Sequence, residues 1–575
     1  MLESVNFCIE KSKKEENYTL AFEKEGIKKY VLSKYTPSKE AEKYLPEDKG
    51  NKQTIWIIFG FALGYVVRRL LEETEAAVQV IIIEPDKKLL EQQLQYDENK
   101  FFTTQSNIKF LVGEIDTNFK NELSAAIPDS EIDNIRTISM PIYLSYYLEY
   151  YRTVKVEIEN TIMNKLVEIN TGKRFGEVFT ANLIKNRKYI EDSYALSELK
   201  NKFRGIPILI VSAGPSLDKN IQYIKDFKGI IIVGNRSLKP VLEQGIKPDY
   251  ICAVDPQDIM YTLKGATIDS DISMITTDSA SEAFIASHKG KKYFVNTHAN
   301  SSSLLGVNTC KEIGMGGSVA TLCLSIAYYL GGNPIVLIGQ DLAYTDGKLH
   351  SQECNTSQTN TVNSSGNRVF TKGYYGEKVQ TSYQFIAYLQ WFEEFIRVHN
   401  NVSYINATEG GAYIEGCTNK NFKDVVKEYS GIIKPDLHQY DKKVIVKKNI
   451  EERLNELLTG LDEMTKWAYK AQLESNKLKI EYSKYKGVRL ERIRKISKAL
   501  DKVDKKLKGD ETISDMTAII FGALDMQAER DKENKEKLNE SVQEEGLRIA
   551  KYSYNLYSNI EKACNTYKRI IEENR

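Results

Sequence analysis

The residues that could take part in chemistry lie in the middle of the chain, each group directly after a run of apolar residues. The first group is Gly214, Pro215 and Ser216, which follows the run 206–211. Glycine has no Cβ to block a close approach, proline fixes a turn, and a serine here can cap the next helix. Exposed backbone N–H groups would then face an anion. The alternative is a plain strand-to-helix turn.

Two further groups follow the next two apolar runs of the chain. Asn235 and Arg236 come after the first of these runs, and Asp255 comes after the second. In open α/β sheets, ligands bind outside the carboxyl ends of the strands. Three successive strand ends would therefore place these side chains on one rim with Gly214 and Ser216. An isolated Asn-Arg pair usually lies in a solvated loop, whereas polar residues from three strand ends on one rim indicate a binding site.

A glycine-rich turn at 314–317 leads into the apolar helical segment 318–330. Gly317 and Ser318 would stand where this helix begins. The N-terminus of a helix carries unpaired N–H groups and a positive partial charge, so this turn offers a second place for a phosphate.

A polar loop follows the apolar run 334–338 and carries Asp341, Tyr344 and His350. An acid, a phenol and an imidazole near one strand end are typical of a catalytic loop. The segment 351–376, rich in Asn, Ser, Thr and Gly, is predicted to be a flexible lid over it. A lone histidine is more often an ordinary surface residue, so His350 gains its interest from this position.

A partial nucleotide-binding pattern lies nearer the N-terminus. Gly60 and Gly64 follow an apolar run, and Glu84 ends the next one. A glycine turn with an acidic strand end could hold phosphates and a ribose. The complete GxGxxG pattern is absent, which favours a plain βαβ unit here.

Patterns of metal ligands are weak. Asp269 and Asp271 have the DxD form by which many glycosyltransferases hold a metal, but they precede a strand-like run, which favours a solvated turn. The seven cysteines form no CxxC pair and the five histidines no HExxH pair. No metal site is therefore predicted, and the need for a divalent ion is left open.

The composition excludes several classes of protein. Lys plus Arg (80) nearly equals Asp plus Glu (79), whereas a nucleic-acid binder usually has a basic excess. No stretch approaches the roughly 20 apolar residues of a membrane span, and the first residues do not resemble a signal peptide. Scattered cysteines fit reduced thiols. We expect a cytoplasmic protein that binds no nucleic acid.

With 575 residues the chain is too long for one hydrophobic core. Buried β-branched runs alternate with helical patterns up to about residue 425, which is typical of parallel α/β domains. After about residue 440, Glu and Lys dominate and apolar residues recur at steps of three and four, which predicts long helices. We expect a Rossmann-like domain with a helical end (1–195), a doubly wound α/β domain (196–430) and a helical bundle (431–575). Residues 1–50 read as irregular.

Six motifs follow one another through the middle domain. They are 212–217, 234–236, 247–250 with 255–256, 316–320, 339–344 and 406–412. In this order they resemble the motifs of the motility-associated (Maf) flagellin glycosyltransferases. They are similar also to those of the bacterial sialyltransferases and of the MptE-like pterin pyrophosphokinase group.

The resemblance implies an enzyme with a sialyltransferase-like central domain. It would transfer pseudaminic or legionaminic acid from the CMP-activated sugar to Ser or Thr of flagellin, in the cytoplasm, as flagellar assembly and motility require. No cofactor is implied besides this donor. Carried over to this chain, the residues holding CMP would be Gly214, Ser216, Asn235, Gly317 and Ser318, with Tyr344 on the phosphate.

The catalytic base stays open. The sialyltransferases have a catalytic histidine near the place where this chain has 373–377, which ends in a glutamate. The candidates are Glu377, His350 and Asp341, in that order. Direct attack of the acceptor hydroxyl would invert the anomeric centre.

Two other functions compete with this interpretation. A pterin pyrophosphokinase would need Mg²⁺-ATP, which Asp255, Asp258 and Asp341 could serve, but such an enzyme needs neither flanking domain. A flagellar chaperone or scaffold would need no chemistry. The helical tail is a candidate for gripping flagellin, and otherwise a stabilising or oligomerising bundle, so a homo-oligomer is left open. The sequence does not identify the nonulosonic acid or the acceptor sites.

Overall fold

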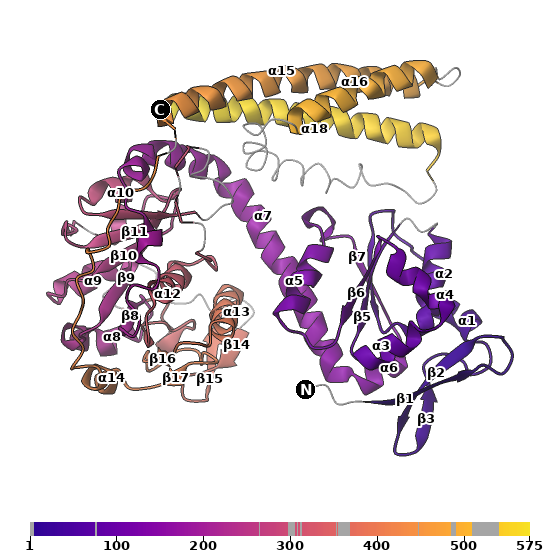
Figure 1. Cartoon of the computed structure of the whole chain (residues 1–575), viewed down its shortest axis with the longest axis horizontal. Coiled ribbons are helices and arrows are strands. Elements are labelled where there is room, and N and C mark those ends of the chain that lie inside the picture. The colour runs from indigo at the N-terminus through magenta and orange to yellow at the C-terminus, as the bar shows by residue number, and fades with distance from the viewer. Residues whose placement is uncertain are drawn as a thin grey trace. The chain divides into compact units, whose positions relative to one another are not determined.

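The computed structural model of the chain divides into two compact units (Figure 1). The first unit comprises 1–174 and 462–564, and the second comprises 175–461 and 565–575. The structure describes residues 5–74, 78–263, 265–296, 305–307, 309–310, 313–351, 354, 369–446, 448–484, 490–508 and 540–575.

The first unit contains a parallel sheet of four strands in the order β6-β5-β4-β7. All five residues of β4 are buried, as expected of a strand covered on both faces. The predicted βαβ unit is confirmed. The strands are β4 (Ile55–Phe59), β5 (Gln79–Glu84), β6 (Ile108–Val112) and β7 (Ile135–Ser139), and the helices beside them include α2 (Tyr65–Glu73), α3 (Lys87–Gln93) and α5 (Thr117–Ala126).

The opening segment is not irregular, and that prediction is wrong. It forms a three-stranded antiparallel sheet of β1 (Asn6–Lys11), β2 (Tyr18–Lys24) and β3 (Ile27–Tyr30). Glu25 and Gly26 join β2 to β3 with φ of 55° and 77°. Two positive φ values are what a tight hairpin turn requires. Glu-Gly is a weaker hairpin signal than Asn-Gly or Asp-Gly, which is why the sequence pattern did not reveal it.

The second unit is built on an eight-stranded sheet in which every strand pair is parallel. Its order is β12-β11-β10-β9-β8-β13-β16-β17, so the chain starts at β8, extends the sheet to one side, and then returns to add β13 on the other. The topological switch point of such a sheet lies between two neighbouring strands whose connections lead to opposite sides of the sheet, and here it lies between β8 and β13. The strands are β8 (Ile208–Val211), β9 (Ile230–Gly234), β10 (Tyr250–Ala253), β11 (Ser273–Thr277), β12 (Lys292–Val295), β13 (Ile335–Ile338), β16 (Tyr404–Asn406) and β17 (Thr418–Asn419).

Helices accompany this sheet as the alternating pattern predicted. They include α9 (Asn235–Glu243), α12 (Val319–Leu330) and α13 (Tyr383–Val398), and the end of the long helix α7 (Leu148–Glu191). Every residue of β8 and β13 is buried, as are nine of the twelve residues of α12. The central α/β domain therefore has a continuous apolar core, with its loops at the carboxyl ends of the strands.

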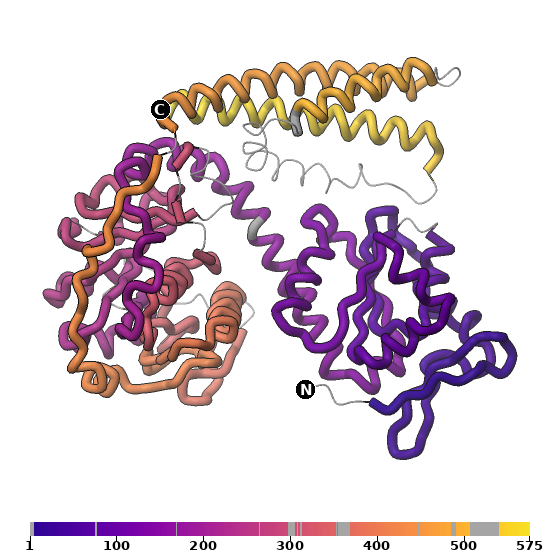
Figure 2. The backbone as a smooth tube through the Cα atoms, viewed as in Figure 1, coloured from indigo at the N-terminus to yellow at the C-terminus, as the bar shows by residue number. Residues whose placement is uncertain are grey.

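The tail forms the long helices that its periodicity predicted (Figure 2). They are α15 (Ile450–Tyr482), α16 (Leu490–Lys508) and α18 (Val542–Asn574). Gln472 of α15 donates to the carbonyl oxygen of Tyr557 of α18 at 3.2 Å, and Tyr557 donates to Asp504 of α16. The three helices thus form one bundle, and the α/β fold with a C-terminal helical region is confirmed.

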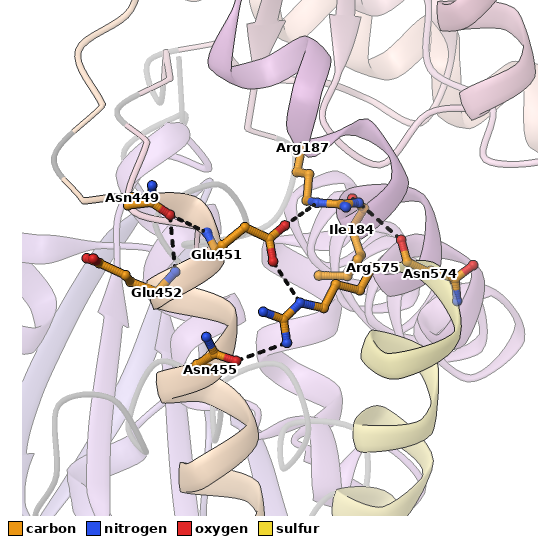
Figure 3. Close-up of polar contacts among 8 residues, drawn as sticks. All are labelled: Ile184, Arg187, Asn449, Glu451, Glu452, Asn455, Asn574 and Arg575. Carbon is orange, nitrogen blue, oxygen red and sulfur yellow. Dashed lines mark hydrogen bonds and ion pairs between the residues drawn. The ribbon is translucent and has the colours of Figure 1, made fainter.

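The last residues of the chain return to the second unit, where Figure 3 shows their contacts. Glu451 accepts from Arg187 Nε at 3.3 Å and from Arg575 Nε at 2.7 Å. Arg187 also donates to the carbonyl oxygen of Asn574 at 3.1 Å, and Arg575 donates to Asn455 at 2.9 Å. This cluster, Arg187–Glu451–Arg575, joins the end of α7, the start of α15 and the C-terminus.

None of the helices in the described ranges is both long enough and apolar enough to span a membrane.

Candidate functional site

The loops that follow β8 and β13 are joined at the switch point by hydrogen bonds. The N–H of Gly214 donates to the carbonyl oxygen of Gly339 at 2.8 Å, and the hydroxyl of Ser212 donates to Gln340 Oε1 at 2.6 Å. Sheets of this type bind their ligands at the switch point, outside the carboxyl ends of the strands. Two motifs far apart in the sequence therefore meet at the place where a ligand is expected.

Asp341 connects these two loops. Its carboxylate accepts from Ser216 Oγ at 2.7 Å, from the N–H of Ser216 at 3.2 Å, and from Thr345 Oγ1 at 2.5 Å. Asp341 is 2% exposed, and its burial raises the pKa of the carboxyl although these hydrogen bonds oppose the rise. An enclosed carboxylate with three donors is suited to holding loops together.

Glycines make this enclosure possible. A Cβ at Gly214 would overlap the carboxylate of Asp341, and one at Gly411 would overlap its backbone. A Cβ at Gly410 would overlap Ser216 Oγ. Gly214 was expected to leave room for a ligand, and in the structure the space beside it is filled by Asp341.

Ser216 stands at the N-cap position of α8 (Leu217–Asn220), but its side chain makes no capping hydrogen bond. The expected cap is therefore absent, because the hydroxyl donates to Asp341 instead. Pro215 lies in the same turn, and its carbonyl oxygen accepts from Asp218 N at 3.4 Å. Since α8 has only four residues and Ser216 is fully buried, the backbone of this turn is a weaker anion site than expected.

Asn235 and Arg236 form the first turn of α9, directly beyond β9. Asn235 is 7% exposed, and its amide has no hydrogen-bond partner among the residues that the structure describes. Buried amides nearly always have a partner. Asn235 therefore marks a place where a ligand could complete the hydrogen bonds.

His350 lies beside the β8 loop and the guanidinium of Arg236. The side chain of His350 bonds to the backbone of Ala213, and the N–H of Ser351 donates to the carbonyl oxygen of Ala213 at 3.0 Å. Burial, with the charge of Arg236, lowers the pKa of His350 to about 4. His350 is therefore uncharged at neutral pH.

The turn before α12 is next to the end of β9. A Cβ at Gly234 would lie 3.2 Å from the side chain of Val319. Ser318 accepts from the N–H of Thr321, whose hydroxyl accepts from the N–H of Ser318, so the predicted helix start carries a reciprocal capping box. Gly317 has φ of 82° and open space around its Cα apart from Tyr388. The carbonyl oxygen of Gly317 accepts from the hydroxyl of Tyr388 at 3.2 Å, and its N–H remains suited to a ligand.

Tyr344 follows Asp341 in the β13 loop. Its ring lies 5.5 Å from that of Phe385, and its N–H donates to the carbonyl oxygen of Gln380 at 2.8 Å. The hydroxyl has no partner within the described part of the chain and the side chain is half-buried, so the phenol O–H can donate to a ligand.

Glu377 lies in the turn of a hairpin formed by β14 (Val369–Lys372) and β15 (Lys378–Thr381). It is exposed, and its carboxylate accepts from the N–H of Tyr375 at 3.0 Å. Tyr375 in turn donates to the carbonyl oxygen of Glu409 at 3.3 Å, next to Gly410. The hairpin thus adjoins the loop that packs on Ser216, but Glu377 itself does not touch Asp341 or His350.

Asp255 stands apart from this group. It is half-buried beyond β10, two strands from β8, and its Oδ1 accepts from Gln257 N at 2.9 Å. Asp269 and Asp271 both pair with Lys247, at 3.0 and 2.7 Å, as a solvated turn would allow. Over the described ranges, no three His, Cys, Asp or Glu residues are grouped to hold a metal ion.

The structure therefore brings most of the predicted residues together around β8, β9 and β13. Asp255 follows the next strand, β10, and Glu377 lies on the hairpin that adjoins the loop at Glu409, without a contact to Asp341 or His350. The sequence did not single out Thr345 and Gly411, which enclose Asp341, or Gly410, which packs on Ser216. The last two lie in the motif 406–412, which was noted without a role. Most of the predicted lid lies outside the described residues.

The glycine turn of the first unit holds no accessible acid. Glu84 is fully buried, accepts from the N–H of Phe61 at 3.0 Å, and accepts from the hydroxyl of Tyr143 at 2.8 Å. A Cβ at Gly60 would overlap the Tyr143 ring. Glu84 holds the turn in place and is not available to a ribose, which supports the plain βαβ interpretation.

Comparisons with known proteins agree with this fold. Residues 181–347 match the family described as 6-hydroxymethylpterin diphosphokinase MptE-like. The structure is similar to that of a MAf glycosyltransferase from Magnetospirillum magneticum AMB-1, with a TM-score of 0.58 and 14% identity, over 99% of this chain and 92% of that chain. The curated proteins contain no match. At this identity the likeness shows a shared fold, which bears out the resemblance read from the motifs.

Proposed function

We propose that this chain is a glycosyltransferase that takes a nucleotide-activated sugar at the switch point of its second unit. The observation that carries the proposal is the gathering of the β8, β9 and β13 loops and the start of α12 at this place, in a fold shared with a MAf glycosyltransferase. The motifs favour a CMP-activated nonulosonic acid as donor and flagellin Ser or Thr as acceptor, with transfer in the cytoplasm.

Binding of the nucleotide is assigned to groups that have unused hydrogen-bonding capacity. These are the amide of Asn235, the N–H of Gly317, and the hydroxyl of Tyr344. Donors of this kind stabilise the negative charge that develops on the phosphate as it leaves. A phosphate is already a good leaving group, so no strong general acid is required.

In the proposed reaction the acceptor oxygen attacks the anomeric carbon while the bond from that carbon to the phosphate oxygen breaks. The electron pair leaves with CMP, and the hydroxyl proton passes to a base. Among the three candidates, Asp341 is enclosed by its donors, and the low pKa of His350 makes it a weak base. Glu377 is exposed, so we assign the base to it. Direct attack inverts the anomeric centre.

The test is transfer measured by mass spectrometry on purified flagellin incubated with the protein and a CMP-nonulosonic acid. A mass increase of one nonulosonate per site is expected. Asn235→Ala should reduce the rate, while Asn400→Ala, at an exposed position of the same unit, should not. Equal rates in both variants would reject the assigned site.

A pterin diphosphokinase is the second candidate because residues 181–347 match that family. It predicts ATP-dependent diphosphorylation of 6-hydroxymethylpterin by the purified protein. The carboxylates suggested for Mg²⁺-ATP are not gathered, since Asp255 lies two strands from β8 and Asp341 is enclosed. Formation of the pterin diphosphate would favour this candidate over the first.

Flagellin from a deletion strain distinguishes the transferase from a scaffold without catalytic activity. Loss of the nonulosonate mass from flagellin supports the transferase. Intact glycans with poor flagellin export would support the scaffold, in which the bundle of α15, α16 and α18 would grip flagellin.

A further inference from the structure

Arg236 is a cation at the proposed site that pairs with no acidic group among the residues that the structure describes. It is the second residue of α9 and is half-buried. Its guanidinium donates to the hydroxyl of Tyr261 at 3.3 Å, and it forms no ion pair with any described residue. A neutral phenol satisfies one of the five N–H groups of an arginine and none of its charge.

The nearby acidic groups do not supply the missing charge. Asp255 and Asp258 follow the neighbouring strand, and each accepts from a backbone N–H of its own turn, from Gln257 and Met260 respectively. His350, on the other side, interacts with the charge of Arg236 and is uncharged at neutral pH. Within the described ranges, therefore, no acidic group offsets the positive charge of Arg236 by an ion pair.

A half-buried arginine without an acidic partner loses part of its hydration and recovers nothing from an ion pair. Its flat fork of N–H groups fits the two oxygens of a carboxylate or a phosphate. The neighbouring amide of Asn235, 7% exposed and without a partner within the described residues, is a second donor at the same place. Two donors in sequence, one of them charged, point to an oxyanion.

We infer that Arg236, with Asn235 beside it, binds an oxyanion of the donor, either the carboxylate of the sugar acid or the phosphate of the nucleotide. This inference rests on the proposed function and specifies its substrate class: the donor is recognised through an anionic group, and Arg236 is the residue that selects for it.

The experiment is isothermal titration calorimetry with two probes. One is CMP alone, and the other is an analogue of a CMP-nonulosonic acid whose sugar cannot be transferred. Arg236→Gln and Arg236→Lys are compared with the wild type. Arg397→Gln is the matched control, because Arg397 is 52% exposed on α13 of the same unit and pairs with Glu394. Equal melting temperatures check that the variants are folded.

Arg236→Gln should weaken binding at least tenfold, the range of a lost charge-assisted hydrogen bond, and Arg236→Lys should weaken it less. Weaker binding of both probes identifies the phosphate as the group bound. Weaker binding of the CMP-nonulosonic acid alone identifies the carboxylate. Either result supports the inference.

Unchanged affinity of Arg236→Gln for both probes, while the wild type binds them, overturns the inference and leaves the proposed function standing. If the wild type binds neither probe, the proposed function falls and the inference falls with it. Loss of affinity in Arg397→Gln equal to that in Arg236→Gln would also overturn it, since any lost positive charge would then suffice.

Discussion

Among single residues, two buried carboxylates have the same role in different units of the chain, since each holds a loop or turn in place. Asp341 accepts three hydrogen bonds that join two loops, and Glu84 accepts two that hold a glycine turn. Both lie at the carboxyl ends of parallel strands, where catalytic acids are also found. Enclosure by donors makes positioning the better interpretation of each.

Asp341→Asn should lower the free energy of unfolding by about 1–3 kcal/mol, because the new amide would turn donors toward Ser216 and Thr345. Urea unfolding of the full chain measures this. Asp424→Asn, at an exposed site of the same unit, is the control. A fully stable Asp341→Asn without transfer activity would instead identify Asp341 as the base.

Glu84 should make the stability of the first unit depend on pH. Burial raises the pKa of Glu84 from 4.5 to about 7, so the folded state binds the proton more tightly than the unfolded state. Its contribution is fully present below pH 4.5 and is lost as the pH rises to 7, by about 3 kcal/mol. The hydrogen-exchange protection factors of peptides covering 60–64, which remove the intrinsic pH dependence of amide exchange, should therefore fall over this range.

Glu84→Gln should remove that dependence, because a glutamine carries no titrating proton and can still accept from Phe61 N. The exposed Glu114→Gln should keep it. Protection factors in the wild type that do not change between pH 5 and pH 7 would contradict the assigned role of Glu84.

At the scale of the element, loops and a hairpin determine the chemistry while the strands position them. The hairpin of β14 and β15 adjoins the loop at Glu409 through Tyr375 and presents Glu377 to solvent. An exposed carboxylate on such an element can meet a large acceptor such as a protein chain, which a buried group cannot.

Glu377→Gln should lower kcat by about 10²–10⁴-fold, the range of a lost general base, and leave CMP affinity unchanged. Steady-state transfer kinetics with calorimetry measure both. Glu415→Gln, also exposed, should behave as the wild type. A Glu377→Gln variant with unaltered kcat would exclude Glu377 as the base and leave His350 as the next candidate.

The elements were largely predictable from the sequence. The runs forming β4, β8, β9 and β13 are continuous and apolar because parallel strands are covered on both faces. The first sheet was not predictable in the same way. β3 is mostly exposed and lysine-rich, so it lacks the apolar signal that marks a strand.

At the scale of the whole molecule, the chain leaves the second unit at α15 and returns to it at 565–575. The cluster Arg187–Glu451–Arg575 holds this return, and the hydrogen bond from Arg575 is the main cause of the lowered pKa of Glu451. The cluster is accessible to solvent, with the Glu451 side chain 50% exposed. Solvent-exposed ion pairs contribute little to stability.

Glu451→Gln should therefore lower the free energy of unfolding by no more than about 1 kcal/mol, and less at high salt. Arg575→Ala combined with Glu451→Gln should cost little beyond the larger single change, because both remove the same interaction. Urea unfolding of the two single variants and the double variant measures this. A loss of several kcal/mol would show that the cluster maintains the fold of the unit.

The strand and helix pattern, the helical tail and the order of the motifs could be predicted before the fold was known, because they depend on local periodicity and on spacing along the chain. The three-dimensional contacts were needed to show that Asp341 accepts from Ser216, that Glu84 is buried, and that Arg236 pairs with no acidic group among the described residues. Burial and pairing depend on which distant segments meet. No local pattern records which residues will be brought into contact across more than a hundred positions of the chain.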